Sequence, residues 1–234
     1  MNKIHLPDKT KSLSIVKYLL LLIVIPLVIF YGVKAFNGKQ YAFISVVVLI
    51  VACIPFFISF EKKGNVERMV MLAVMVALSV FGRYCFSFIP HFKPVTAIVI
   101  ITGIYMGGEF GFLCGALSAL LSNFIFGQGP WTPFQMFAWG LAGLLAGILG
   151  KYLKEFVALL ALYGCLCGMS YSLIMDIWTT MWQDGTFNVA RYLTYITIAV
   201  PTTVTYMISN IIFLVVLTKP IGKKIERIKN KFGV

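Results

Sequence analysis

Hydrogen-bonding and aromatic side chains that could hold a small molecule gather in a polar stretch between two apolar segments of the chain. This stretch, FGQGPWTPF, runs from residue 126 to residue 134. Its prolines and glycines predict a compact, non-helical loop. Within it, Gln128 and Thr132 offer hydrogen bonds, and Trp131 offers a flat apolar surface. These residue types are suited to recognition of a ligand.

Polar and aromatic side chains beside this loop extend the candidate site. Asn123 and Gln135 flank the loop, and each could bind a ligand or cap a helix end. All four tryptophans lie in polar stretches or in the adjoining halves of apolar segments: Trp131, Trp139, Trp178 and Trp182. Two interpretations remain open, an interfacial aromatic belt and an aromatic-lined cavity that opens to one side of a membrane. In the second, Trp131 and Trp182 converge over one mouth.

Asp176 is a carboxylate inside a predicted helix. It lies six residues before Trp182, which is about 9 Å along a helix. A carboxylate that faces lipid is costly, so Asp176 should face protein or a wet cavity. Its role stays open between contact with a ligand and a structural ion pair with Arg83 or Arg191.

The sequence supports neither a catalytic centre nor a metal centre. It contains no GxxxxGK[ST], HExxH or GxSxG motif. The two histidines, His5 and His91, lie far apart. Cys165-x-Cys167 lacks the CxxC spacing and the second ligand pair of a zinc site. We therefore expect no catalytic residues, no metal and no cofactor.

The composition predicts which elements position these side chains. Hydrophobic residues make up 60% of the 234 residues, charged residues 12%, and the mean hydropathy is +0.92, whereas about a quarter of the residues in soluble proteins are charged. These values predict an all-α polytopic membrane protein without a sizeable soluble domain. Apolar runs that could cross a hydrocarbon core of ~30 Å occur at about 16–33, 41–60, 69–82, 94–108, 110–126, 134–150, 156–182 and 192–218.

Lysine and arginine predict the orientation of these segments. Fifteen of the 20 fall on the side that also carries both termini, and the other five are Lys34, Lys39, Arg83, Lys93 and Arg191. The positive-inside rule places both termini in the cytoplasm and the FGQGPWTPF loop outside. The net charge of +12 needs no nucleic acid, because the basic C-terminal tail can meet anionic lipid or a cytoplasmic partner. A signal peptide that ends after Ala35 is the competing interpretation of the first segment, and we expect a retained helix.

Small residues at four-residue spacing predict close helix packing. Such pairs are Gly103-xxx-Gly107, Gly111-xxx-Gly115, Gly143-xxx-Gly147 and Gly164-xxx-Gly168. Ala73-xxx-Ala77 begins the third segment on its cytoplasmic side, where it could face this chain or a helix of a partner. The segment 94–108 spans only ~22 Å, and short segments bounded by glycine or proline often seat a ligand. Pro201 is expected to kink the last segment.

From Arg83 to Gly147 the chain resembles the substrate-binding S components of energy-coupling factor (ECF) vitamin transporters. The stretches IPHFKPVTAIVI and SNFIFGQGPWTPFQMFAWG carry the resemblance, which covers six spans from about residue 64 to 218. It implies a six-helix vitamin-binding bundle at 64–234, including the basic tail, which docks on a transmembrane T component and two ATPase subunits. Residues 1–63 would form an extension of two further transmembrane helices.

The resemblance also implies roles for individual residues. Ala73 and Ala77 would contact the T component, and the FGQGPWTPF loop would form part of a lid over the vitamin. The side chains expected at the vitamin are Arg83, Asn123, Gln128, Trp131, Thr132, Gln135, Trp139, Asp176, Trp182 and Tyr195. The loops are most similar to those of S components assigned to cobalamin or related corrinoids, while riboflavin, folate, a queuosine precursor or another micronutrient stays open. The alternative function is a non-catalytic channel or membrane scaffold.

Overall fold

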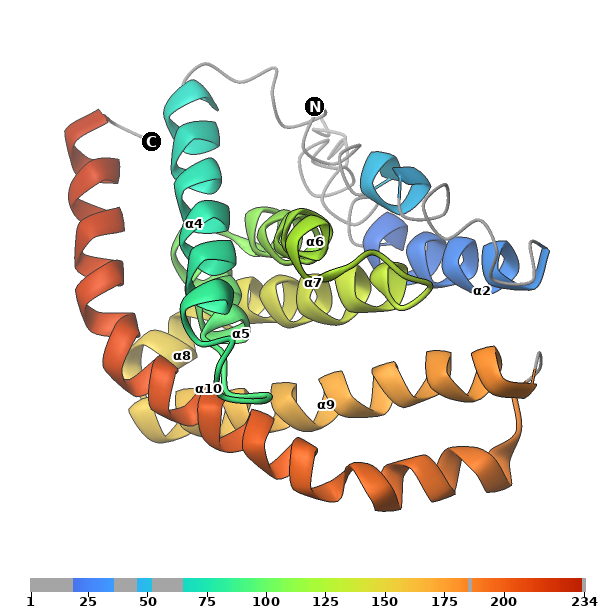
Figure 1. Ribbon diagram of the computed structural model, residues 1–234. Helices are drawn as coiled ribbons and strands as arrows, with labels where there is room; N and C mark the ends of the chain where they lie inside the picture. Colours follow the sequence, from blue (N-terminus) through green and yellow to red (C-terminus); the bar gives the residue numbers. More distant parts are fainter. Residues whose placement is uncertain (1–18, 36–45, 52–64, 185–186, 233–234) are drawn as a thin grey trace, which may run out of the picture.

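Helices make up most of the part of the chain that the computed structural model describes, residues 19–35, 46–51, 65–184 and 187–232 (Figure 1). These residues contain no β-strand. Four helices are long and apolar enough to cross a membrane: α4 (Asn65–Cys85), α6 (Gly108–Phe126), α9 (Val157–Asp184) and α10 (Val189–Phe232). Two shorter apolar helices complete the bundle: α5 (Val95–Met106) and α7 (Thr132–Ile148). The predicted class of all-α polytopic membrane protein is confirmed.

The N-terminal extension is described in part. A π-helical turn, η1 (Leu20–Val24), leads into α2 (Ile25–Ala35) at the position of the first predicted span. Leu21, Ile25 and Ile29 are buried, and α2 contacts α7. Of the second predicted span, residues 46–51 are helical and the others lie outside the described residues. The division of the chain at residue 63 stays a prediction.

The central helix of the bundle is α5. Its sequence, VTAIVIITGIYM, is apolar on every side, which is typical of a helix without a lipid or solvent face, and all its residues except Tyr105 are buried. It contacts α4, α6, α7, α9 and α10. Its 12 residues span only ~18 Å, so the longer helices around it extend past its ends. Polar side chains meet in one of these end regions.

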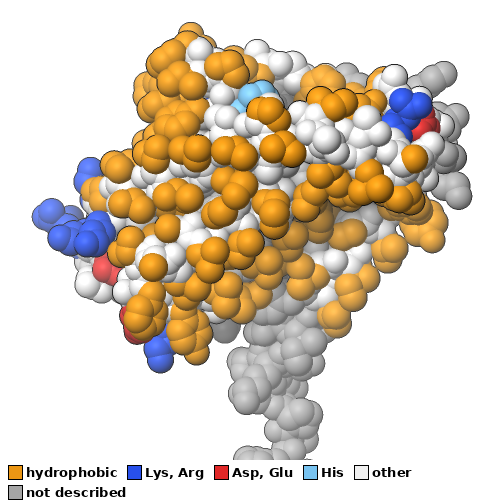
Figure 2. Space-filling view, turned by 90° about the horizontal axis from the view of Figure 1, so that it is seen from below, with side chains coloured by type: hydrophobic (Ala, Val, Ile, Leu, Met, Phe, Trp, Pro, Cys, Tyr) orange, Lys and Arg blue, Asp and Glu red, His pale blue; other side chains and the backbone are white. Residues whose placement is uncertain are grey.

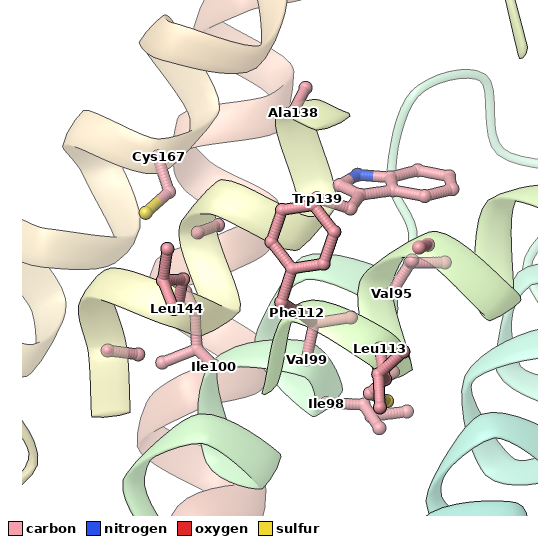
Figure 3. Close-up of a cluster of buried hydrophobic side chains, with 14 of the residues drawn as sticks. Val95, Ile98, Val99, Ile100, Phe112, Leu113, Ala138, Trp139, Leu144 and Cys167 are labelled. Atoms are coloured by element: carbon pink, nitrogen blue, oxygen red, sulfur yellow. The ribbon is translucent and has the colours of Figure 1, made fainter. Parts of the chain in front are cut away.

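Glycines bring the central helices into backbone contact, as their spacing predicts. A Cβ atom on Gly103 or on Gly111 would overlap the carbonyl oxygen of Gly143. Backbone atoms cannot move aside as the end of a side chain can, so α5, α6 and α7 approach to a distance that only glycine permits. Beside these contacts, the fully buried Phe112 and Leu144 fill the layer between the three helices (Figure 3).

α10 is longer than the predicted last span, which ended at residue 218. It continues through the basic tail, and its 44 residues measure ~66 Å, about twice the thickness of a hydrocarbon core. Pro201 and Pro220 lie inside it, and the helix curves along its length (Figure 1). The six-residue helix α8 (Gly150–Glu155) is a second element that the apolar runs did not predict.

Charged side chains hold together the end of the bundle that is predicted to be cytoplasmic. Arg68 donates to the Met106 carbonyl oxygen at 2.9 Å, and Lys154 forms an ion pair with Glu226 at 3.2 Å. On the face in Figure 2, hydrophobic side chains cover most of the surface and charged side chains lie at its edges. This distribution is typical of a protein surrounded by lipid. The orientation of the termini stays a prediction.

Candidate ligand-binding site

A chain of hydrogen bonds, here called the polar network, joins four helices near the predicted outer end. Arg83 Nη1, near the end of α4, donates to Ser122 Oγ and, at 2.9 Å, to Asn123 Oδ1 on α6. Asn123 Nδ2 donates to Gln135 Oε1 on α7 at 2.9 Å, and Gln135 Nε2 donates to the Tyr171 hydroxyl on α9 at 2.8 Å. Asn123 and Gln135 are 1% and 4% exposed. At such burial, polar groups are stable only when they satisfy one another.

The FGQGPWTPF loop is tied to the polar network by its own side chains. A positive φ of 99° at Gly127 follows the end of α6. Thr132 Oγ1 accepts from Asn123 Nδ2 at 2.9 Å and donates to Gln128 Oε1 at 2.9 Å. Gln128 Nε2 donates to the Leu120 carbonyl oxygen at 2.9 Å. Gln128 and Thr132 thus form hydrogen bonds within the chain, and their contact with a ligand stays a prediction.

Aromatic rings line the same region and form what we call the aromatic wall: Trp139, Tyr171 and Tyr206. The Trp139 and Tyr171 rings stack, with centroids 5.3 Å apart and planes 14° from parallel. Tyr206 on α10 meets Tyr171 edge-on at 5.0 Å. The Tyr206 hydroxyl lies 3.0 Å from Nδ1 of His91, an exposed residue of the α4–α5 loop. Flat faces of this kind can extend a stack onto a planar ligand.

Two cations lie beside the aromatic wall. The guanidinium carbon of Arg83 is 4.7 Å from the centroid of the Phe126 ring and 5.3 Å from that of Trp139. Lys93 Nζ, in the α4–α5 loop, is 5.4 Å from the Phe126 centroid. Burial, together with the charge of Arg83, lowers the pKa of Lys93 below its ordinary value. The site therefore combines neutral amides and hydroxyls with positive charge.

Asp176 forms neither of the two ion pairs considered for it. Arg191 Nε pairs instead with Asp184 Oδ2 at 2.6 Å, and Arg83 donates to neutral partners. The Oδ2 atom of Asp176 is buried without a hydrogen-bond partner among the described residues. The structural interpretation of this carboxylate is thus not supported, and its contact with a ligand stays a prediction.

The remaining predicted site residues lie outside the polar network. Trp131 packs on Trp178, with ring centroids 5.7 Å apart. Trp182 is 53% exposed, and its convergence with Trp131 over one mouth stays a prediction. Tyr195 lines, with Arg191, a separate pocket of ≈ 330 Å³ near the α9–α10 turn. The structure therefore brings together Arg83, Asn123, Gln128, Thr132, Gln135 and Trp139, and it leaves Trp182 and Tyr195 apart from them.

The Ala73-xxx-Ala77 pair lies in an open apolar groove between α4 and α6. Both alanines are exposed, and the groove has a volume of ≈ 780 Å³. Large apolar side chains such as Met69, Phe81 and Leu117 line the groove beside them. Small residues in an exposed apolar groove allow another helix to approach closely.

Sequence reasoning missed Ser122 and Tyr171 as members of the site. A tyrosine in an apolar helix looks like any core aromatic residue, so hydropathy does not mark it. A usable signal existed in α9, because Gly164, Gly168 and Tyr171 follow one another at spacings of four and three and share a face. That face packs on α10, where a Cβ atom on Gly168 would lie 2.8 Å from the Met207 nitrogen.

An apolar helical bundle with a polar and aromatic site at one end defines a membrane-embedded binding protein. The family described as "ECF-type riboflavin transporter, S component" matches residues 63–227, which is most of the chain. The chain belongs to this family, and it is thus a substrate-specific subunit of an ECF-type importer, a class of transport proteins that work with a T component and ATPases. Comparisons with curated proteins and with solved structures give no match.

Proposed function

We propose that the protein binds a vitamin at the polar network and aromatic wall and that this site opens to the outside. The observation that carries the proposal is the continuous path of hydrogen bonds from Arg83 through Asn123 and Gln135 to Tyr171. Polar groups are costly inside a membrane bundle and tend to mark a functional site. Because the path crosses four helices, a ligand that binds there would contact several elements of the bundle together.

We propose a flavin as the ligand. The matched family is described by riboflavin and not by cobalamin, so the corrinoid expectation is not confirmed. A planar ring could extend the stack of Trp139 and Tyr171. The amide groups of Asn123 and Gln135 each carry a donor and an acceptor. They could therefore replace their present hydrogen bonds by bonds to the edge of a flavin ring, where donors and acceptors alternate. Asp176 Oδ2, which lacks a partner among the described residues, could accept a further hydrogen bond.

We further propose that the T component docks in the groove that contains Ala73 and Ala77, with both termini in the cytoplasm. Two features support the proposal. The groove is open and apolar, and its alanines are exposed although small residues usually mark close helix contacts. Two ATPase subunits would complete the importer with this T component.

Ligand binding by the purified chain tests the proposed function. Mass spectrometry of small molecules released from the protein should find one vitamin, and flavin fluorescence should be quenched on titration with the protein. Cobalamin should be titrated in the same panel of candidate ligands, with its absorbance as the readout. Tyr171→Phe keeps the aromatic wall but removes the acceptor of Gln135, so it should weaken flavin binding. Tyr195→Phe, outside the network, is the matched control. A folded protein that binds no panel member would favour the channel or scaffold alternative.

A further inference from the structure

Two positive charges approach one aromatic ring at the candidate site. The Arg83 guanidinium carbon and Lys93 Nζ lie 4.7 and 5.4 Å from the centroid of Phe126, both within the ~6 Å range of a cation–π contact. Lys154 pairs with Glu226 and Arg191 pairs with Asp184, whereas neither Arg83 nor Lys93 forms an ion pair with a described residue. No carboxylate of the described residues therefore neutralises Arg83 or Lys93.

The guanidinium of Arg83 retains an unused edge. Its Nη1 atom makes both of its hydrogen bonds, to Ser122 Oγ and Asn123 Oδ1. Its Nε and Nη2 atoms make none to the described residues. These two groups form the planar fork that holds a carboxylate or a phosphate through two parallel hydrogen bonds. The neutral partners at Nη1 keep the fork in a fixed orientation without occupying it.

The neighbours of Arg83 are buried residues of the candidate site. Trp139, whose ring centroid lies 5.3 Å from the guanidinium carbon, is 6% exposed. Asn123, which accepts its hydrogen bond, is 1% exposed. A partly buried arginine beside a lysine is unfavourable unless an anion accompanies it. Such an anion would relieve the repulsion between both cations at once.

We infer that Arg83 and Lys93 form an anion site within the ligand pocket, and that the transported ligand carries a carboxylate or phosphate group there. This inference rests on the proposed function. For a flavin, it names the phosphate ester, flavin mononucleotide, as the preferred ligand over neutral riboflavin. The phosphate would accept the Nε and Nη2 fork of Arg83 and a charged hydrogen bond from Lys93, while the ring lies along the aromatic wall.

Riboflavin and flavin mononucleotide are a matched pair of probes because they differ only in the phosphate. Fluorescence titration of the purified full chain should give an affinity for flavin mononucleotide at least about tenfold higher, the scale of a hydrogen bond to a charged group. Equal affinities for the two flavins would confirm the proposed flavin site and overturn the anion site.

Two variants assign the preference to named side chains. Arg83→Gln and Lys93→Gln should each lower the ratio of the affinity for flavin mononucleotide to the affinity for riboflavin, and Arg83→Gln should lower this ratio by about tenfold or more. Arg191→Gln, which removes an outer arginine already paired with Asp184, is the control and should leave this ratio unchanged. If Arg83→Gln fails to fold, Lys93→Gln decides, and an unaltered preference in that variant overturns the inference.

Two further measurements separate other occupants from the transported ligand. If the parent binds neither flavin, the flavin assignment fails, and the anion site is tested by thermal unfolding in inorganic phosphate against chloride at equal ionic strength. Phosphate should then raise the midpoint of thermal unfolding of the parent but not of Arg83→Gln or Lys93→Gln. Equal midpoints of the parent in phosphate and in chloride would overturn the anion site.

If flavin mononucleotide binds, exchange of phosphatidylcholine for phosphatidylglycerol vesicles should change its affinity by less than about threefold. A larger loss would identify a lipid headgroup as the occupant.

Discussion

Replacement of both Ala73 and Ala77 by leucine tests the docking role of the α4–α6 groove. Both alanines are exposed in a groove of ≈ 780 Å³, so longer side chains have room in the isolated chain. Such surface changes alter the free energy of unfolding by ~0.5 kcal/mol or less. Against a closely packed partner helix, each added side chain should cost docking ~1–3 kcal/mol. The double variant should therefore dock about 30-fold more weakly, or worse.

Three measurements on this variant separate docking from ligand binding. Vitamin uptake by cells that also express the T component and both ATPase subunits should fall at least about tenfold. Co-purification with the T component should fall in parallel. The ligand affinity of the purified variant should stay within about threefold of the parent. Ala158→Leu, at another exposed alanine on α9, is the control and should leave all three unchanged.

Either of two results would refute this reasoning. Unchanged uptake by the double variant would show that the groove does not meet the T component. Loss of ligand binding and of thermal stability, together with uptake, would show that the alanines pack within the bundle instead. The second result would contradict their exposure in the structure.

Three further predictions concern packing, titration and topology. Gly143→Ala should lower the thermal midpoint more than Gly164→Ala, because the new Cβ would overlap a backbone oxygen of α6 in the first case and the end of a leucine side chain in the second; equal losses would contradict this. Burial and a neighbouring lysine lower the pKa of His91 below its ordinary value, so the folded protein takes up a proton at His91 less readily than the unfolded protein does. The free energy of unfolding is therefore fully retained above pH ~6.5 and decreases as the pH falls below it. The midpoint difference between the parent and His91→Asn should therefore shrink on acidification, and a growing difference would be the contrary result. In a cysteine-free background, Phe88→Cys should react with an impermeant thiol reagent in intact cells and Lys154→Cys should not, whereas the reverse pattern would invert the topology.

Hydropathy predicted the helices of the bundle well because each must bury its side chains or expose them to lipid. The predicted segments 110–126 and 156–182 correspond to α6 (Gly108–Phe126) and α9 (Val157–Asp184). The predicted last span ends at residue 218, whereas α10 continues to Phe232, because hydropathy marks the membrane-crossing part of a helix and not its full length. Beyond the apolar run, Ile221, Ile225 and Ile228 continue a helical stripe at spacings of four and three, which predicts the longer helix.

The candidate site could be predicted as a set of residues but not as a set of contacts. Asn123 and Gln135 are conspicuous because amides are rare in apolar helices, and the structure joins them directly. Partner choice depends on the rotation of each helix, which composition does not contain. Arg191 illustrates the difficulty, since it pairs with Asp184 across the short α9–α10 turn and not with the intramembrane Asp176.

One helix pair connects the two proposed surfaces. Arg83 lies six residues after Ala77 on α4, ~9 Å along the helix, and it bonds Asn123 on α6. The groove proposed for the T component is lined by the same two helices. A ligand that binds Arg83 and Asn123 would therefore influence the distance between α4 and α6 at one end of the pair. The T component would influence the same distance along the groove. If that spacing differs between the free and ligand-bound protein, linkage requires the ligand and the T component to change each other's affinity by the same factor, and no third helix is needed to transmit the effect.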